Sequence, residues 1–516
     1  MRRRTILKKQ YVSNRSELRR VSILKQLTAI EKELQKSHSD RRLDAEAKAI
    51  EKIKTNPKFF FTFAKRYSKV KVKVGPLINK QYSSVFSTPK DEDTPQEANT
   101  DDLNIPSLNR INFSDSELAE AINDLASNAA PGPDGFPAIL LKKCSAALSP
   151  PLARIWRSSL ETGEIPIICK SAVITPIHKG KSRAVPKNYR PVALTSHLIK
   201  VFEKVLRKHI VDFMTTNILF NSSQHGFRSG RSCLSQLLNH FDKITTELEK
   251  GYSLNAMNKL SVDNTMIFNS DKFELIRYSN KLSKEVQSET SYLSNNGTNI
   301  EEKQHVRDLG ITLSNDATFA QHIAERCLLV KSKTAWILRT FQSRDHIPMI
   351  TLWKTLVLCH LDYCSQLWSP STAGNIQCLE LLQRAFITRI AGMAGLSYWD
   401  QLTSLKLYSL ERRRDRYQII YTWRVIEGQV PNLESTPINS IHSDRRGRSC
   451  IVPTITSSAP QRIKSIRFAS LPFKGPRLFN SLPQNIRNLT NCDVTTFKGA
   501  LDRFLLTCLT SHYCLV

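Results

Sequence analysis

The sequence lacks any long uninterrupted apolar run. Its most apolar stretch, residues 349–368, contains Lys354, His360 and Asp362, and a membrane-spanning helix needs about 20 consecutive apolar residues. The first residues, MRRRTILKKQYVSNRS, are basic but lack the apolar core of a secretory signal peptide. We therefore expect no membrane partner, and we expect an intracellular protein of the nucleus or cytoplasm that is not secreted. The basic N-terminal segment fits a nuclear localisation signal or an arm that contacts phosphates.

The sequence also lacks a paired cysteine framework. Its 11 Cys are scattered singly, which is typical of reduced thiols in an intracellular chain. Cys359, His360, Cys364 and Cys378 raise the alternative of a zinc site, but their spacing fits no common ligand pattern. They fall on an amphipathic helical pattern, so we favour buried thiols and predict no metal ligands.

Acidic residues are few relative to basic ones. The chain has 75 Lys and Arg against 46 Asp and Glu, a formal net charge of +29. Neutralising phosphates releases condensed counterions, so a surplus of this size is typical of proteins that bind RNA or DNA. The alternative is a soluble protein that is basic without such a partner.

Helical patterns dominate what is present. Helix formers with apolar residues at helical spacing run from Glu17 to about Ile53, where Asn56-Pro57 ends them. Residues 69–74 alternate Lys and Val as a strand would, and residues 88–102 are acidic and typical of a linker. After residue 271 helical patterns dominate. The chain is long enough for several domains, and we predict a helix-rich α+β fold.

Three further patterns predict local structure. Ser114 and Glu117 form a capping box that opens a helix. Asp134, within the PGPDG turn, is predicted to bond its own backbone rather than to act as a catalytic acid. The tryptophans at 336, 353 and 368 lie at helical spacing among aliphatic residues, so we expect core positions rather than base-stacking platforms.

Three blocks follow one another in a specific order. They are NAAPGPDGFPAILLK, VITPIHKGKSRAVPKNYRPVALTSHLIKVFEKVL and SSQHGFRSGRSC. This order resembles the reverse transcriptase of non-LTR retrotransposons of the LINE type, jockey-like. The resemblance runs from about residue 56 almost to the C-terminus and is most specific between residues 127 and 232. It implies the remnant of a right-hand polymerase with fingers and thumb, with RNA-directed DNA polymerase as the family activity.

The resemblance implies two groups of site residues. Lys179 and Arg190 match fingers residues that hold the triphosphate of an incoming nucleotide, a role suited to groups that stay cationic. The alternative is that both are ordinary surface cations. A second set matches the segment that approaches the template, where glycine permits close approach and arginine meets phosphate. This set comprises Gly226, Phe227, Arg228 and Arg231.

The resemblance also shows that this chain lacks the family's metal-binding motifs. In the family, aspartates in two palm motifs bind a pair of Mg²⁺ ions. Here the one Asp-Asp pair, Asp101-Asp102, falls in the acidic stretch, and Asp263 is single, so we interpret it as an N-cap or turn residue. The segments LEKGYSLNA and MIFNSDKFELIRY resemble the two sides of the missing part and join at about residues 255–260. The gap is about a hundred residues, most of an ordinary domain.

We therefore predict an internally deleted copy that is catalytically inactive, with no catalytic residues and no bound Mg²⁺. The alternatives are a non-specific RNA- or DNA-binding remnant, and a decayed or mispredicted gene product that folds poorly. The predicted segments are a basic helical N-terminal segment (1–67), a linker with an acidic stretch (68–110), the fingers and start of the palm (111–250), a truncated palm remnant (251–315), a helical thumb and C-terminal region (316–430) and a basic C-terminal tail with a short helix (431–516).

Overall fold

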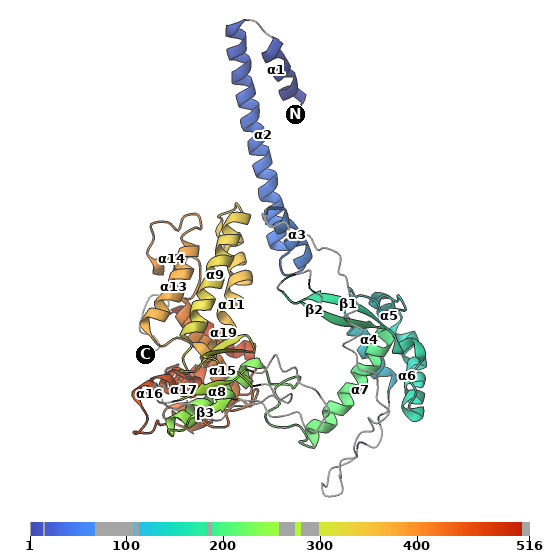
Figure 1. Cartoon of the computed structure of the whole chain (residues 1–516), viewed down its shortest axis with the longest axis vertical. Helices are drawn as coiled ribbons and strands as arrows, with labels where there is room; N and C mark the ends of the chain where they lie inside the picture. The colour runs from blue at the N-terminus through green and yellow to red at the C-terminus, as the bar shows by residue number, and fades with distance from the viewer. Residues whose placement is uncertain are drawn as a thin grey trace. The chain divides into compact units, whose positions relative to one another are not determined.

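The computed structural model describes residues 2–13, 16–67, 108, 111, 113–180, 182, 185, 188–256, 274–279 and 299–507. The chain forms two compact units (Figure 1). The larger unit comprises Met1–Val70 and His225–Val516, and the smaller unit comprises Lys71–Gln224. The predicted strand at 69–74, the acidic stretch at 88–102 and Asp263 lie outside the described residues.

The smaller unit packs helices around one aromatic core. Phe113 and Phe202 stack with ring centroids 5.2 Å apart, and Trp156 lies 4.6 Å from Phe202. The predicted capping box is confirmed, since Ser114 accepts from the Glu117 backbone N–H and Glu117 bonds back to the Ser114 N–H. The elements are α4 (Asp115–Asn123), α5 (Ala138–Lys143), α6 (Ser145–Thr162), the 3-10 helix η1 (Ile167–Lys170), β1 (Ala172–His178), β2 (Tyr189–Thr195) and α7 (His197–Thr216).

The PGPDG turn is packed against the junction of β2 and α7. A Cβ on Gly132 would lie 2.6 Å from the Ser196 backbone nitrogen, so this approach requires glycine. Asp134 accepts from the Phe136 backbone N–H at 3.3 Å and from Ser196 Oγ at 2.5 Å. The predicted turn-forming role of Asp134 is therefore confirmed. The same carboxylate also links the turn to Ser196, the residue before α7.

The larger unit begins with α1 (Arg2–Ser13), α2 (Glu17–Glu51) and α3 (Pro57–Tyr67). The predicted helix from Glu17 is confirmed, and α1 lies alongside it, with an Arg4–Glu31 ion pair of 2.9 Å (Figure 1). The C-terminal part of α2 is anchored by buried Glu46, which accepts from the backbone N–H groups of Gln342 and Ser343 at 3.0 and 2.9 Å.

Helices form most of the remaining larger unit. The first elements are α8 (Cys233–Glu249), β3 (Leu254–Ala256), β4 (Ile276–Tyr278), β5 (His305–Asp308), β6 (Ile311–Ser314), α9 (Ala320–Thr340), α10 (His346–Leu352), the π-helix η4 (Trp353–Val357), α11 (Leu358–Asp362) and α12 (Ser365–Trp368). The later ones are α13 (Ala373–Ile387), α14 (Tyr398–Ser404), α15 (Leu410–Ile426), β7 (Ser440–Ser443), β8 (Gly447–Cys450), α16 (Gln461–Ala469), α17 (Leu471–Asn480), α18 (Gln484–Arg487) and α19 (Val494–Thr507).

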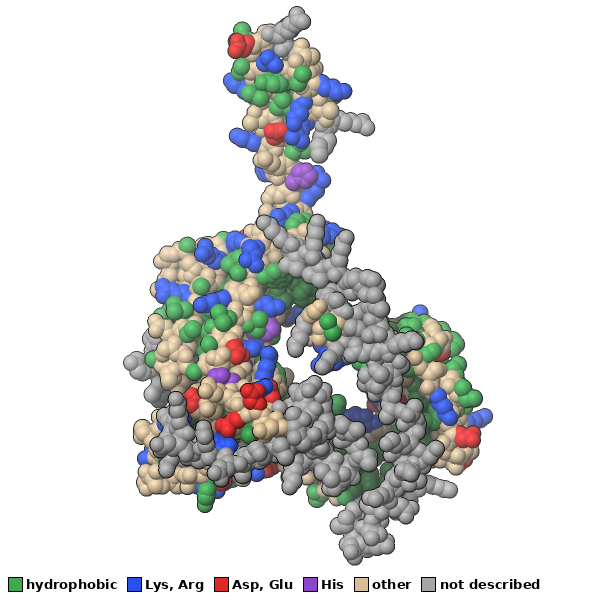
Figure 2. Space-filling model, viewed as in Figure 1, with side chains coloured by type: hydrophobic (Ala, Val, Ile, Leu, Met, Phe, Trp, Pro, Cys, Tyr) green, Lys and Arg blue, Asp and Glu red, His purple; other side chains and the backbone are tan. Residues whose placement is uncertain are grey.

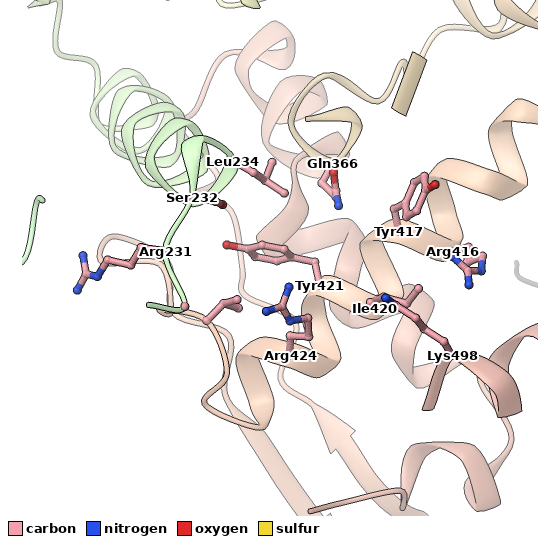
Figure 3. A pocket seen from close by; sticks show the side chains of 12 residues that line it. Arg231, Ser232, Leu234, Gln366, Arg416, Tyr417, Ile420, Tyr421, Arg424 and Lys498 are labelled. Carbon is pink, nitrogen blue, oxygen red and sulfur yellow. The ribbon is translucent and has the colours of Figure 1, made fainter. Parts of the chain in front are cut away.

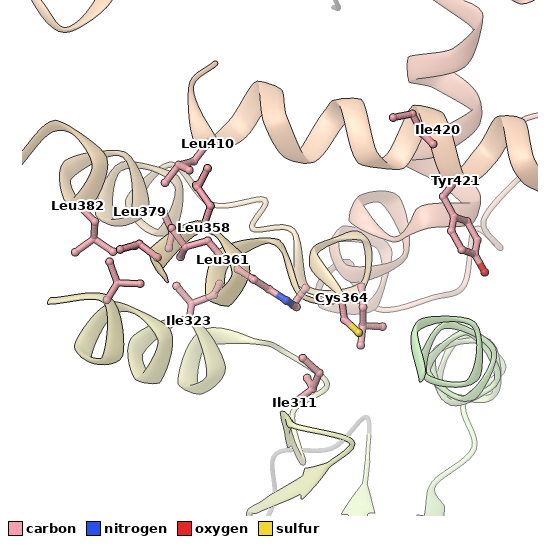
Figure 4. Packing of buried hydrophobic residues seen from close by; sticks show 14 of the residues in the cluster. Ile311, Ile323, Leu358, Leu361, Cys364, Leu379, Leu382, Leu410, Ile420 and Tyr421 are labelled. Atoms are coloured by element: carbon pink, nitrogen blue, oxygen red, sulfur yellow. The ribbon is translucent and has the colours of Figure 1, made fainter. Parts of the chain in front are cut away.

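One continuous apolar core joins these helices (Figure 4). Trp353 and Trp368 are fully buried in it and Trp336 packs against it, so the prediction of core tryptophans is confirmed. Aliphatic residues of β6, α9, α11 and α13 meet in the same core. Burial of such large side chains is the main stabilising contribution available to this unit.

The strands of the described residues span three to seven residues each. There they form four two-stranded antiparallel sheets, β1–β2, β3–β4, β5–β6 and β7–β8. The β3–β4 pair joins residues on either side of the predicted deletion, with Leu254 opposite Tyr278. The fold is therefore helix-rich, as predicted, and its described sheets are small and antiparallel. No helix in the described part of the chain combines the length and apolarity that a bilayer span requires.

Candidate nucleic-acid interface

The structure places Lys179 and Arg190 at one end of the β1–β2 hairpin in the smaller unit. Arg190 stands opposite Ile177, and the Lys179 backbone N–H donates to the Asn188 carbonyl at 2.7 Å, which extends the ladder by one pair. Side chains alternate along a strand, so Lys179 and Arg190 share one face of the hairpin. Both are exposed, whereas Tyr189 on the opposite face is buried. The two predicted nucleotide-facing cations are therefore neighbours.

The loop of residues 226–231, which we call the arginine loop, lies in the larger unit directly before α8. His225 is buried and its Nδ1 is 2.7 Å from Ser235 Oγ, which anchors the start of the loop. Burial, with Arg231 as the next contributor, lowers the pKa of His225, so its ring stays neutral at pH 7. A Cβ on Gly230 would lie 3.0 Å from the Gln429 carbonyl oxygen, so the far end of the loop also packs closely.

Phe227 projects from the arginine loop. Its side chain is 93% exposed, and its backbone has a φ of 59°, in the left-handed region that non-glycine residues rarely occupy. Exposure of a large aromatic side chain beside arginines gives a surface on which a base can stack. The anchors at His225 and Gly230 hold the two ends of the loop backbone from which this side chain projects.

A cavity of about 610 Å³ adjoins the arginine loop, within the larger unit (Figure 3). One wall is the loop and the start of α8, and another is α15. The lining residues are Gly230, Arg231, Ser232, Leu234, Gln366, Arg416, Tyr417, Ile420, Tyr421, Arg424, Val430 and Lys498. Four of these side chains are cationic and none is acidic, so the cavity favours an anionic ligand.

Arg416 and Tyr417, which line the cavity, are held by neighbouring carboxylates. Arg416 pairs with Asp502 through both Nε and Nη2. The Tyr417 hydroxyl donates to Asp362 at 3.1 Å, and Arg413 lies beside the same carboxylate. These contacts fix the position of α15 side chains along one edge of the cavity.

The predicted template-contacting set is therefore split. Arg231 lines the cavity, whereas Gly226, Phe227 and Arg228 do not belong to its lining. Sequence reasoning missed the contribution of α15. The available signal was the spacing of Tyr417, Tyr421 and Arg424, at i, i+4 and i+7, which places them on one helix face.

The described residues contain no group of three His, Cys, Asp or Glu side chains arranged to hold a metal ion. Cys327 and Cys378 have their Sγ atoms 3.4 Å apart, and burial raises the pKa of the Cys327 thiol to about 12. The prediction of buried thiols is confirmed for Cys364. It is wrong for Cys359, which is exposed on α11, and Cys378 is only half-buried.

Known proteins resemble parts of this chain. It is 34% identical over 122 residues to the probable RNA-directed DNA polymerase from transposon BS of Drosophila melanogaster, which covers 23% of this chain and 14% of that protein. It is 29% identical over 146 residues to the corresponding protein from transposon X-element of the same organism, covering 28% of this chain and 16% of the relative. The chain is similar to non-LTR retrotransposon reverse transcriptases.

A third relative of this reverse-transcriptase-like chain is the uncharacterised 149 kDa protein of transposon TX1 from Xenopus laevis, 30% identical over 90 residues, which are 17% of this chain and 7% of that protein. No protein-family model matches the chain. The matched stretches thus span between 7% and 16% of the relatives' lengths. The predicted resemblance to reverse transcriptases is confirmed over these stretches, and the LINE-type, jockey-like assignment stays a prediction.

Proposed function

We propose that this chain is an internally deleted reverse-transcriptase remnant that binds RNA or DNA through its basic surface and does not synthesise DNA. The observation that carries the binding proposal is the arginine loop, which presents Phe227 at 93% exposure next to Arg228. An exposed aromatic ring supplies sequence-tolerant stacking, and the neighbouring cations attract the phosphate backbone. The nucleotide-holding roles of Lys179 and Arg190 belong to the same proposal.

The charge distribution supports non-specific rather than base-specific contact. On the face seen in Figure 2, Lys and Arg side chains are spread over the helical upper part of the larger unit, and Asp and Glu side chains gather below them. Dispersed cations neutralise phosphates without selecting a base sequence. The formal charge of +29 gives the chain a long-range attraction for any polyanion.

The inactivity proposal rests on the carboxylates. Metal-dependent phosphoryl transfer requires carboxylates that converge on the ions, and the sequence has one Asp-Asp pair, Asp101-Asp102, outside any apolar strand pattern. We infer that no Mg²⁺ pair is held for catalysis. Primer extension on an RNA template with Mg²⁺ or Mn²⁺ tests this, and template-dependent synthesis above a mock preparation would overturn it.

Fluorescence anisotropy with labelled single-stranded RNA and DNA tests the binding proposal. We expect affinity to fall steeply as salt rises. Phe227→Ala should weaken binding by about 1 to 3 kcal/mol, the usual contribution of one stacked base. Phe61→Ala, which removes a half-exposed ring on α3, is the matched control and should leave affinity unchanged. No binding at low salt, together with rapid proteolysis, would instead support a decayed product that folds poorly.

A further inference from the structure

The cavity beside the arginine loop contains a buried donor for which the described part of the chain offers no acceptor. Tyr421 is 5% exposed, lines the cavity, and its hydroxyl has no hydrogen-bond partner among the described residues. Burial raises the pKa of Tyr421 to about 12, so the hydroxyl carries its proton at neutral pH. Buried polar groups are nearly always hydrogen-bonded in native proteins, so this hydroxyl points to a ligand that accepts from it.

A second donor lies one turn further along α15. The Nε of Arg424 is buried and also has no partner among the described residues. Its spacing of three residues from Tyr421 puts both side chains on one helix face. Figure 3 shows Tyr421 between Ser232 and Arg424, with its hydroxyl end turned toward the loop. Lys498 of α19 adds an ammonium group to the same cavity.

The start of α8 supplies the opposite wall. Ser232 caps this 17-residue helix through its bond to the Ser235 backbone N–H, and Ser232 and Leu234 line the cavity. The first N–H groups of a helix and its dipole favour negative charge at this end. An anion in the cavity would therefore contact a helix N-terminus, a neutral hydroxyl donor and cationic side chains from three separate elements.

We propose that this cavity binds a phosphate group of a single-stranded nucleic acid, with Tyr421 and Arg424 donating to its oxygens. The inference rests on the proposed function and deepens it by naming the site. Phosphate fits because it accepts several hydrogen bonds and suits a guanidinium fork. A volume of about 610 Å³ exceeds the need of one phosphate and admits a whole nucleotide, and the arginine loop leads a strand into it through Arg231.

The test measures binding of the full chain to labelled 12-residue oligo(U) and oligo(dT) by anisotropy over a salt series. Arg424→Gln should weaken both about tenfold and reduce the slope of log affinity against log salt by about one. Tyr421→Phe should weaken both about threefold to tenfold without changing the slope, because it removes a neutral donor. Arg384→Gln, which removes an exposed arginine from α13, should change neither quantity.

Unfolding midpoints of all variants are compared with the parent chain, and Lys498→Gln replaces Arg424→Gln if that variant does not fold. A second arm titrates uridine 5′-monophosphate and inorganic phosphate by calorimetry. Unchanged oligonucleotide binding by the Tyr421 and Arg424 variants overturns the cavity site and leaves the proposed function standing. If uridine 5′-monophosphate binds and Arg424→Gln abolishes that binding, but no oligonucleotide binds, the cavity is a phosphate site, and both its assignment to a nucleic acid and the proposed function are overturned. Absence of all binding overturns both.

Discussion

Arg467 donates a hydrogen bond from Nη1 to Asp242 Oδ1 at 2.7 Å, and both side chains are almost fully buried. Its Nε also donates to Glu249 Oε2 at 3.1 Å. Arg467 belongs to α16, and the two carboxylates belong to α8. The network therefore fastens the helix before the predicted deletion to the C-terminal part of the chain.

Arg467→Met should destabilise the larger unit strongly, because it leaves Asp242 and Glu249 buried without their cation. Breaking a buried pair in this way costs about 3 to 5 kcal/mol. Urea unfolding followed by tryptophan fluorescence measures the effect. Lys464→Gln, on the same helix but with a partly exposed side chain, should cost less than about 0.5 kcal/mol. A loss below about 1 kcal/mol for Arg467→Met would show that the network contributes little.

His322 should make stability depend on pH. Its Nδ1 accepts from the Thr312 backbone N–H at 3.1 Å, and burial, with Arg326 as the next contributor, lowers its pKa from 6.5 to about 4. Below pH 6.5 His322 is protonated in the unfolded chain, whereas in the folded chain it becomes protonated only near pH 4. Stability from this group is thus full above pH 6.5 and is lost as pH falls toward 4, on the order of 3 kcal/mol in all.

The measurement for His322 is urea unfolding at a series of pH values from 7.5 downward. His322→Asn keeps an acceptor for the Thr312 N–H but cannot titrate. This variant should lose the pH dependence between 6.5 and 4 that belongs to the histidine. Identical pH profiles for the two proteins would contradict the assignment.

Gly475 should not tolerate a side chain. A Cβ there would overlap Thr422 Oγ1 and lie 3.3 Å from Leu471 Cδ1, because α15 and α17 cross at this glycine. We expect Gly475→Ala to destabilise the larger unit by about 1 to 3 kcal/mol. Thermal unfolding measures it, and adding Thr422→Ala should recover part of the loss.

Gly499 provides the matched control for Gly475. It lies inside α19 with open space around the added Cβ, so Gly499→Ala should stabilise by about 0.5 to 1 kcal/mol through helix propensity. Equal changes in stability for Gly475→Ala and Gly499→Ala would mean that α15 and α17 are not tightly packed where they cross.

Asp134→Ala should loosen the smaller unit locally. It removes the acceptor for Ser196 Oγ and for the Phe136 N–H, a loss of about 1 to 2 kcal/mol. Amide hydrogen exchange should speed up around the start of α7 and leave the larger unit unchanged. Asp212→Ala, an exposed carboxylate on α7, is the control. If Asp134→Ala and Asp212→Ala change amide exchange equally, the Asp134 hydrogen bonds do not stabilise the smaller unit.

Local structure was predictable because it depends on short-range chemistry. The capping box at Ser114, the turn at Asp134 and the helix from Glu17 all follow from side chains that bond or pack within a few residues. Phe227 and Arg231 were identified by a resemblance, and the structure gives them different surroundings, one exposed on the loop and one in the cavity.

The cavity itself was not predictable, because its walls come from distant parts of the chain. Arg231 and Arg424 line one space although 193 positions separate them in sequence. Helical periodicity places Tyr421 and Arg424 on one face, but it does not say what that face meets. The Arg467 network has the same character, since its partners Asp242 and Glu249 lie more than 200 residues away.

The sequence by itself determined the helix-rich class, the basic surplus, the resemblance to reverse transcriptases and the shortage of paired aspartates, because each is written in composition, spacing or motif order. Tertiary structure alone decided which cations converge and which are engaged. It pairs Arg416 with Asp502 but leaves Arg424 Nε and the Tyr421 hydroxyl facing a cavity. The physical reason is that packing of α8, α15 and α19 fixes these distances, and packing depends on long-range burial.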